Sequence, residues 1–162
     1  MLKYKKLHED SIAPTKAHAT DAGYDFYVHT IQFKDNEEHL AGDFWQNTNH
    51  VFVSPGEMVK IHTGIAVGLP EGCAGFLWDR SGMGSKEIHR LAGVIDQSYN
   101  GEIICLLYNL SSKYVRIDKG DKVIQMIVQK VESPELVEVS DLAPSERGNK
   151  GFGSSDIEST NE

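Results

Sequence analysis

The sequence predicts an all-β fold, either a β-barrel or a jelly roll, on three observations. Short apolar and β-branched runs follow one another from residue 51 to residue 131, and turns rich in proline and glycine separate them. No stretch keeps an apolar period of 3.6 residues, so at most one short helix is expected, near residues 84–90. The chain has 162 residues, of which 40% are hydrophobic, and this is enough to bury a core. Many short strands with few helices are typical of barrels and jelly rolls.

The first third of the chain alternates strand-like runs with polar connections. Residues 3–8 alternate apolar and basic side chains and predict a first strand. Residues 19–28 end in an aromatic run that predicts a second strand, with Asp25 near its mouth. Residues 29–50 mix acidic residues, aromatics and turn formers, which predicts a long surface loop or an extra hairpin anchored by Trp45. Loops of this length are uncommon without a purpose.

From Val51 onward the strand pattern is regular. Strands are expected at residues 51–53, 58–61, 64–69, 74–78, 102–108, 114–117 and 123–131. After residue 145 the chain turns to Gly, Ser, Asn, Asp and Glu, a composition that does not support a packed core. Residues 1–144 are therefore predicted to form the barrel, and residues 145–162 a flexible C-terminal arm.

Composition restricts the classes of function. The net charge of −8 argues against binding along a nucleic-acid backbone. No apolar run has the length of a membrane span, and the basic N-terminus lacks the apolar stretch of a secretory signal. Cys73 and Cys105 lie in apolar surroundings without the spacing of a zinc site, so they are expected to be buried free thiols, which suit a reducing compartment. A soluble protein of the cytoplasm is expected, or of the host-cell cytoplasm if the protein is viral.

The hairpin Leu91-Ala-Gly-Val-Ile-Asp-Gln-Ser-Tyr-Asn-Gly101 is the central candidate site. It lies between strand-like segments and carries one carboxylate, Asp96, beside an aromatic ring. Taken alone, the pattern fits a small-molecule site and an ordinary hairpin with a solvated aspartate equally well. By turn chemistry alone, Asn100-Gly101 is the natural turn of this hairpin.

Two glycine-rich segments carry cations and hydroxyls that suit an oxyanion. In the first, Arg80 precedes Ser81-Gly-Met-Gly-Ser-Lys86, where glycines let backbone amides approach an anion and arginine supplies a fork of donors. The second is Arg147-Gly-Asn-Lys-Gly-Phe-Gly-Ser-Ser155, in which Phe152 could stack on a flat ring. A solvated glycine turn and a disordered tail are the respective alternatives.

A polar residue on an apolar strand and the hairpin carboxylate complete the pattern. Gln125 lies among apolar neighbours and needs a partner, either core backbone or a ligand. Together with the two glycine loops, these residues predict a nucleotide with several phosphates. Asp96 would then be a general base that activates water, with Mg²⁺ on the phosphates.

Five segments, in this order and spacing, resemble the five motifs of the homotrimeric deoxyuridine triphosphatases (dUTPases). They are Ala22-Gly-Tyr-Asp-Phe26, Arg80-Ser-Gly-Met-Gly-Ser-Lys86, Gly93-Val-Ile-Asp-Gln-Ser-Tyr-Asn-Gly101, Gly120-Asp-Lys-Val-Ile-Gln-Met-Ile127 and Arg147-Gly-Asn-Lys-Gly-Phe-Gly-Ser-Ser155. The resemblance implies a distorted jelly-roll barrel, and three copies that share their active sites. The implied reaction converts dUTP and water to dUMP and pyrophosphate, which keeps uracil out of DNA and supplies dUMP for thymidylate synthesis.

The resemblance also implies a role for each residue of the hairpin. Asp96 would orient and deprotonate the water that attacks the α-phosphate. Gly93, Val94 and Ile95 would read the uracil edge. Tyr99 would pack under the deoxyribose and leave no room for a 2′-hydroxyl. The comparison moves the tip of the hairpin to residues 96–99.

The other motifs would hold the phosphates. The residues implied to bind them are Arg80, Ser81, Gly82 and Gln125. Asp25 would help to place Mg²⁺, through water. A lid over the nucleotide would consist of Arg147, Phe152, Gly153, Ser154 and Ser155.

The sequence departs from the family pattern at several points. Asp79 stands before Arg80 where the family usually has proline, and it could weaken phosphate affinity or pair with Arg80. Ser98 replaces a common second acid, and residues 29–50 are longer than the usual link. An alternative function is therefore a nucleotide-responsive regulatory protein that binds a partner through residues 29–50. A deoxycytidine triphosphate deaminase on the same fold is disfavoured by the Gly-Val-Ile-Asp hairpin.

Overall fold

The computed structural model describes residues 1–33, 49–145, 148 and 149. The chain divides into two units, Met1–Glu132 and Ser133–Glu162. The described strands all lie in the first unit, and the described part of the second has no helix or strand. The boundary predicted at residue 145 stays a prediction.

The first sheet is antiparallel and is built around one long strand. β5 (Met58–Gly68) pairs on one side with β9 (Glu102–Asn109), which pairs in turn with β7 (Ile88–Leu91). On its other side, β5 pairs with both β1 (Lys3–Lys6) and β3 (Thr30–Phe33). The sequence predicted two strands between residues 58 and 69, but they form one strand with an irregular register between His62 and Ala66.

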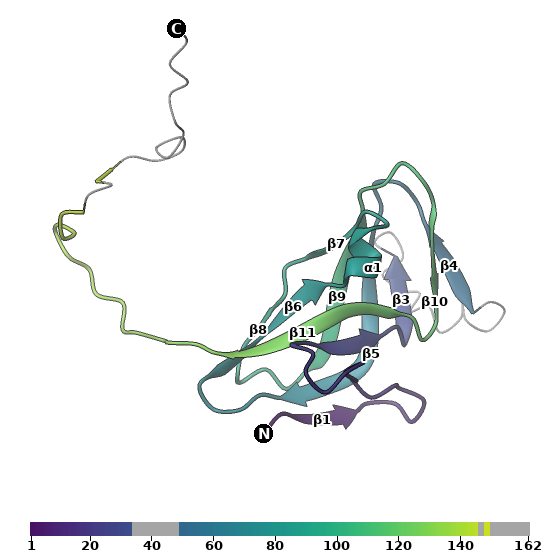
Figure 1. Cartoon of the computed structure of the whole chain (residues 1–162), viewed down its shortest axis with the longest axis horizontal. Coiled ribbons are helices and arrows are strands. Elements are labelled where there is room, and N and C mark those ends of the chain that lie inside the picture. The colour runs from purple at the N-terminus through teal and green to yellow at the C-terminus, as the bar shows by residue number, and fades with distance from the viewer. Residues whose placement is uncertain (34–48, 146–147, 150–162) are drawn as a thin grey trace, which may run out of the picture. The chain divides into compact units, whose positions relative to one another are not determined.

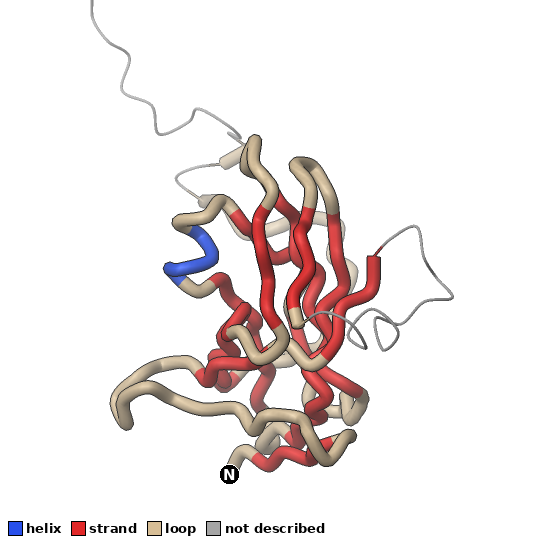
Figure 2. The backbone as a smooth tube through the Cα atoms, turned by 90° about the vertical axis from the view of Figure 1, so that its right-hand side faces the viewer, coloured by secondary structure: helices blue, strands red, loops and turns tan. Residues whose placement is uncertain are grey.

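The second sheet carries the candidate site. Its order is β2 (Tyr24–Tyr27), β11 (Lys122–Lys130), β6 (Cys73–Asp79) and β8 (Val94–Ile95), all antiparallel. A separate two-stranded ribbon pairs β4 (His50–Val53) with β10 (Val115–Asp118). Figure 1 shows how these elements are arranged, and Figure 2 shows strands throughout this unit.

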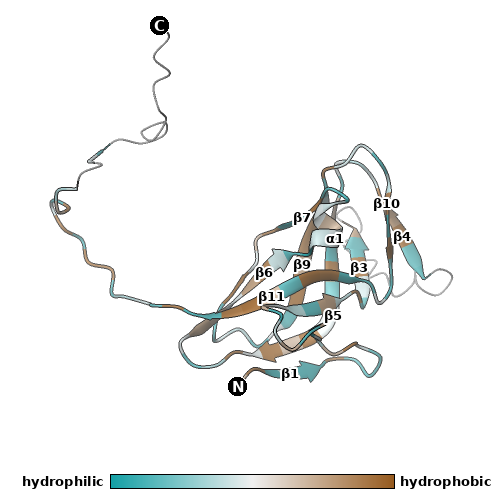
Figure 3. Ribbon diagram, viewed as in Figure 1, coloured by the Kyte–Doolittle hydropathy of each residue, from teal (hydrophilic) through white to brown (hydrophobic). Residues whose placement is uncertain are grey.

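The core lies between the inward faces of these sheets. Because successive residues of a strand point to opposite faces, β9 buries every second residue from Ile103 to Asn109. Side chains from the two sheets and the ribbon form one buried cluster, which includes Phe26, Ile61, Leu77, Ile103, Ile117, Ile124 and Met126. In Figure 3 β11 carries brown, apolar stretches, whereas β1 is teal. Cys73 and Cys105 are free and buried, as predicted, and burial raises the pKa of the Cys105 thiol to about 12.

The predicted single helix exists, but it lies earlier in the chain than expected. α1 (Ser81–Gly84) is one turn, closed by a hydrogen bond from the Ser85 amide to the Ser81 carbonyl, and Met83 anchors it in the core. Of the expected residues 84–90 only Gly84 is helical: residues 85–87 form a turn, and residues 88–90 belong to β7. There, pairing with β9 and burial of Ile88 outweigh local preference. The all-β prediction is confirmed.

Candidate functional site

A sharp bend places the hairpin against β6. Gly93 has φ +123°, a region that side chains rarely adopt, and its carbonyl accepts the Leu77 amide at 2.8 Å. A Cβ atom at residue 93 would lie 3.1 Å from the Leu77 carbonyl oxygen. Val94 and Ile95 then pair with Phe76 and Gly75. Glycine at residue 93 therefore sets the direction in which the hairpin leaves the sheet.

The tip of the hairpin lies at residues 96–99. The Tyr99 amide donates to the Asp96 carbonyl at 3.0 Å, so Asn100-Gly101 is not the turn. The Tyr99 hydroxyl donates to the Glu102 carbonyl at 2.7 Å. A Cβ atom at Gly101 would lie 2.6 Å from the Tyr99 hydroxyl, so the ring packs directly on this glycine. Tyr99 is thereby fixed in one orientation with its ring partly exposed.

A cavity of about 210 Å³ opens at this tip. It is lined by Val94, Ile95, Asp96, Tyr99, Glu102 and Ile104. Its walls are mainly apolar, and Asp96 contributes an exposed carboxylate with no hydrogen-bond or ion-pair partner among the described residues. The structure thus brings four residues of the predicted nucleoside site, residues 94–96 and 99, around one cavity.

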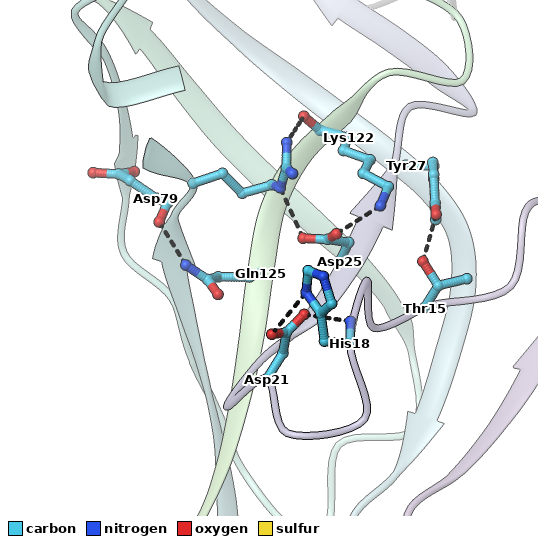
Figure 4. Close-up of polar contacts among 9 residues, drawn as sticks. Thr15, His18, Asp21, Asp25, Tyr27, Asp79, Lys122 and Gln125 are labelled. Carbon is cyan, nitrogen blue, oxygen red and sulfur yellow. Dashed lines mark hydrogen bonds and ion pairs between the residues drawn. The ribbon is translucent and has the colours of Figure 1, made fainter. Parts of the chain in front are cut away.

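Asp25 is the centre of a second group of predicted residues (Figure 4). The Arg80 Nε donates to Asp25 Oδ1 at 2.7 Å, and the Lys122 Nζ donates to Asp25 Oδ2 at 2.9 Å. The Arg80 Nη1 also donates to the Lys122 carbonyl at 3.1 Å. Asp25 is buried, and both its oxygens accept cationic donors. The hydrogen bond to Asp25 raises the pKa of the Lys122 ammonium above its usual range.

Sequence reasoning missed Lys122. It lies two residues after Gly120, inside the fourth motif. The signal that could have found it is its positive charge, three residues before Gln125, which was predicted to bind phosphate. The β11 register places Gln125 opposite Asp25, so that Asp25, Arg80, Lys122 and Gln125 come together.

Gln125 is held by backbone. Its Nε2 donates to the Asp79 carbonyl at 3.0 Å, as Figure 4 shows. Of the two partners considered for Gln125, backbone or a ligand, the structure therefore shows backbone. Gly23 makes room for its amide, because a Cβ atom there would lie 2.6 Å from Gln125 Oε1. The Gln125 amide therefore has one well-defined orientation.

The segment after Arg80, which begins with α1, is open on its outer side. Ser81 and Gly82 are exposed, and a Cβ atom at Gly82 would meet no other atom within 4 Å outside its own helix. Lys86, in the turn that follows α1, lines a different cavity of about 410 Å³ together with Lys113 and Arg116. The backbone of residues 81 and 82 is thus accessible, while Lys86 belongs to another surface.

The Asp79 carboxylate does not pair with Arg80, so that hypothesis was wrong. Asp79 Oδ2 lies 2.6 Å from His89 Nδ1, and Asp79 Oδ1 accepts the Arg90 amide at 2.8 Å. Asp79 and Arg80 are adjacent on a strand end and therefore point in different directions.

Several predicted residues lie outside the described part of the chain. They are Arg147, Phe152, Gly153, Ser154 and Ser155, together with residues 34–48 of the predicted insert. Within the described ranges, no group of three or more His, Cys, Asp or Glu side chains could hold a metal ion, and no helix could cross a membrane. No hydrogen bond between described residues joins residues 93–99 directly to Asp25, Arg80 or Gln125.

Comparison with known proteins gives a consistent result. The dUTPase family model matches residues 44–156. The chain is 35% identical to the deoxyuridine 5′-triphosphate nucleotidohydrolase of Mycolicibacterium gilvum over 159 residues, covering 93% of this chain and 91% of that protein. The corresponding figures for the Clostridioides difficile protein are 35% over 156 residues, with 94% and 96% covered. The human mitochondrial protein is 34% identical over 154 residues, but the chain spans only 54% of its length.

Solved structures resemble this fold over almost the whole chain. The dUTPase of Staphylococcus bacteriophage 80alpha with dUPNHPP has a TM-score of 0.77 and 28% sequence identity, covering 97% of this chain and 99% of that one. An aspartate-to-asparagine mutant of the phage phi11 dUTPase, described with a structural Mg(II) ion, has a TM-score of 0.68 and 26% identity, with 87% and 97% covered.

Proposed function

The chain belongs to the dUTPase family and is a dUTP diphosphatase, and on that premise we propose how its residues divide the reaction. The hairpin of residues 93–99 binds the nucleoside, and Arg80, Ser81, Gly82 and Gln125 bind the phosphates. Asp96 is the general base. The observation that supports this most directly is the cavity at the hairpin tip, where a carboxylate without a partner among the described residues adjoins a fixed aromatic ring.

Asp96 is suited to act on water. Its carboxylate is exposed and has no partner among the described residues, so it can accept a proton from a bound water. That water attacks the α-phosphorus, the bond between the α-phosphorus and the bridging oxygen breaks, and pyrophosphate leaves. The products are dUMP and pyrophosphate, and the proton resides on Asp96 until it passes to solvent.

The neighbouring residues select the nucleoside. Gly93 and the strand β8, Val94–Ile95, lead to Asp96, so a base bound along them places its phosphates near the carboxylate. Tyr99 cannot move without breaking its hydrogen bond to the Glu102 carbonyl. A fixed ring beneath the sugar excludes a 2′-hydroxyl by shape, which is the basis for preferring deoxyribose.

Mg²⁺ fits this site as part of the substrate. When bound on the phosphates, the ion neutralises their charge and helps to orient them. Both oxygens of Asp25 already accept hydrogen bonds from Arg80 and Lys122, so Asp25 would reach such an ion through water. Asp25 also holds the Arg80 guanidinium and the Lys122 ammonium beside the phosphates.

A trimer with shared sites would bring the two groups of residues together. Within one chain no described hydrogen bond links the hairpin to Arg80 or Gln125. Large apolar side chains are exposed around the hairpin, namely Trp78, Leu91, Val94 and Ile104. Packing against another copy would remove these apolar side chains from water, which favours association. The lid of residues 147 and 152–155 is proposed on the motif alone.

A panel of nucleoside triphosphates with Mg²⁺ tests this assignment. Pyrophosphate and the monophosphate should appear together from dUTP and not from dCTP, dTTP or UTP. Comparable turnover of dTTP or UTP would contradict the roles given to the hairpin strand and to Tyr99. Release of ammonia from dCTP would indicate the deaminase alternative.

A second function is proposed for residues 29–50. The similar phage 80alpha dUTPases are described as controlling transfer of virulence genes by a proto-oncogenic G protein-like mechanism, and a phi11 structure as showing a species-specific insert. A regulatory role for this chain would need residues 29–50 but would not need the hydrolysis of dUTP by Asp96. Deleting residues 34–48 should then leave dUTP hydrolysis intact and abolish binding of a regulator that the full chain binds in the presence of dUTP.

A further inference from the structure

The Arg90 side chain of β7 joins the end of β6 to the start of the hairpin. β6 and β8 lie in one sheet, and β7 lies in the other. The chain leaves β7 at Leu91 and enters β8 at Val94, so residues 92 and 93 carry it from one sheet to the other. Both have positive φ, +63° at Ala92 and +123° at Gly93. A bend of this kind depends on contacts that hold its carbonyls.

Arg90 supplies one of these contacts. Its Nη1 donates to the Ala92 carbonyl, and the carbonyl of the next residue, Gly93, accepts the Leu77 amide. The Arg90 guanidinium carbon lies 5.1 Å from the centre of the Trp78 ring, within the range of a cation–π interaction. Arg90 Cδ would lie 3.5 Å from a Cβ atom at Gly93. Arg90 is thus packed between the end of β6 and the bend.

Asp79 fixes the backbone from which Arg90 projects. Its Oδ1 accepts the Arg90 amide at 2.8 Å, and its Oδ2 lies 2.6 Å from His89 Nδ1. Both carboxylate oxygens are therefore used to bridge the two sheets. The Asp79 carbonyl accepts a hydrogen bond from Gln125 Nε2. Asp79 therefore also contacts one of the side chains that are proposed to bind the phosphates. Four residues thus connect the two sheets at this point: Trp78, Asp79, His89 and Arg90.

We propose that Arg90 is a positioning residue for nucleoside binding, which acts through the Ala92–Gly93 bend on the strand that leads to Asp96. Asp79 and Trp78 hold Arg90 in place. This gives a role to the aspartate that precedes Arg80. The inference rests on the proposed function, because it takes residues 93–99 as the nucleoside site.

Substitution at residue 90 in the full chain tests this role. Arg90→Met keeps an apolar stem against Trp78 but removes the donor to Ala92, whereas Arg90→Lys keeps one donor. We expect Arg90→Met to weaken dUMP binding, measured by calorimetry, about tenfold, the effect of losing a hydrogen bond from a charged group. KM for dUTP should rise by a similar factor, while kcat and inhibition by pyrophosphate change less than about twofold. Arg90→Lys should recover most of the dUMP affinity.

Two further variants separate the possible failures. Arg116→Met removes an arginine that pairs with Asp118 on β10, and it should leave dUMP affinity unchanged. Tyr99→Ala should weaken dUMP binding if the hairpin is the nucleoside site. If Tyr99→Ala has no effect, the proposed assignment of the nucleoside site to residues 93–99 fails. If Tyr99→Ala weakens binding and Arg90→Met does not, the positioning role is wrong. Equal losses of dUMP and pyrophosphate affinity in Arg90→Met would also overturn it, because they indicate general disruption.

Discussion

Arg80 and Asp25 form an ion pair across strand β11, with 2.7 Å between Arg80 Nε and Asp25 Oδ1. Asp25 lies on β2 and Arg80 directly follows β6, while β11 runs between these strands. Arg80 also donates to the Lys122 carbonyl on β11, so one side chain ties three strands together. The proposed phosphate residues are therefore pre-positioned by the same contacts that stabilise the sheet.

Asp25→Asn should destabilise the protein as well as impair turnover. The variant keeps the shape but removes the negative charge that Arg80 and Lys122 share. The loss of charge-assisted hydrogen bonds at a buried acceptor is expected to cost about 1.5–3 kcal/mol of unfolding free energy. Urea denaturation measures this. The control Asp118→Asn removes the exposed partner of Arg116 and should change stability little. Wild-type stability in Asp25→Asn would contradict a structural role for the pair.

Asp96→Asn should separate binding from chemistry. The amide is isosteric but cannot take a proton from water, so turnover of dUTP should fall by about 10²–10⁴-fold. Binding of a non-hydrolysable dUTP analogue should stay near the wild-type value, since the cavity keeps its shape. Calorimetry and single-turnover assays give both quantities. Near-normal turnover would exclude Asp96 as the general base.

Gly93→Ala should be more costly than Gly72→Ala, although both glycines have positive φ. At Gly72, with φ +67°, alanine would adopt the left-handed conformation at a cost of about 1–2 kcal/mol. At Gly93, φ +123° lies outside that region, so the backbone penalty there is at least as large. At Gly72 a Cβ atom would meet no other atom within 4 Å, whereas at Gly93 it would lie 3.1 Å from the Leu77 carbonyl oxygen. Unfolding free energies and KM for dUTP test this difference. Equal stability losses with an unchanged KM would mean that the bend tolerates a side chain.

Stability should fall on acidification below neutrality, in part because of His29. Burial lowers the pKa of the His29 imidazole, against a smaller opposite effect of Asp10. Below about pH 6.5 an unfolded histidine binds a proton that the folded one resists, so the unfolded state binds more protons and stability is lost as pH falls. The pKa of Glu102 is also lowered in the folded protein, so this group too costs stability as pH falls, but only in the acidic range where carboxylates titrate.

His29→Phe should flatten this dependence. The phenyl ring keeps the stacking against His8, where the ring centres are 4.5 Å apart, and cannot take a proton. Unfolding free energies between about pH 8 and pH 5 should then vary less than in the wild type, a range chosen around the usual histidine pKa. His18→Gln is the control, since the His18 side chain is 81% exposed. An unchanged slope in His29→Phe would show that burial of His29 does not govern the pH dependence.

The sequence alone determined the all-β class, most strands, the buried thiols and the candidate residues. These properties follow from local rules: the period of apolar residues, the turn chemistry of glycine and proline, and the order of the five motifs. Local rules failed for the turn at Asn100-Gly101 and for the position of the short helix. There, packing of Tyr99 on Gly101 and pairing of β7 with β9 decided the outcome.

Only the tertiary structure decided which charged groups meet. Asp25 and Lys122 are 97 residues apart in the sequence, and Arg80 and Asp25 are 55 apart. Strand periodicity indicates which face a residue occupies but not which strand will lie beside it, because the neighbour is chosen by the register and order of the whole sheet. For the same reason the sequence left two alternatives for Asp79, weaker phosphate affinity or a pair with Arg80, and neither names its actual partners. In the folded protein it bridges instead to His89 and Arg90 in the other sheet.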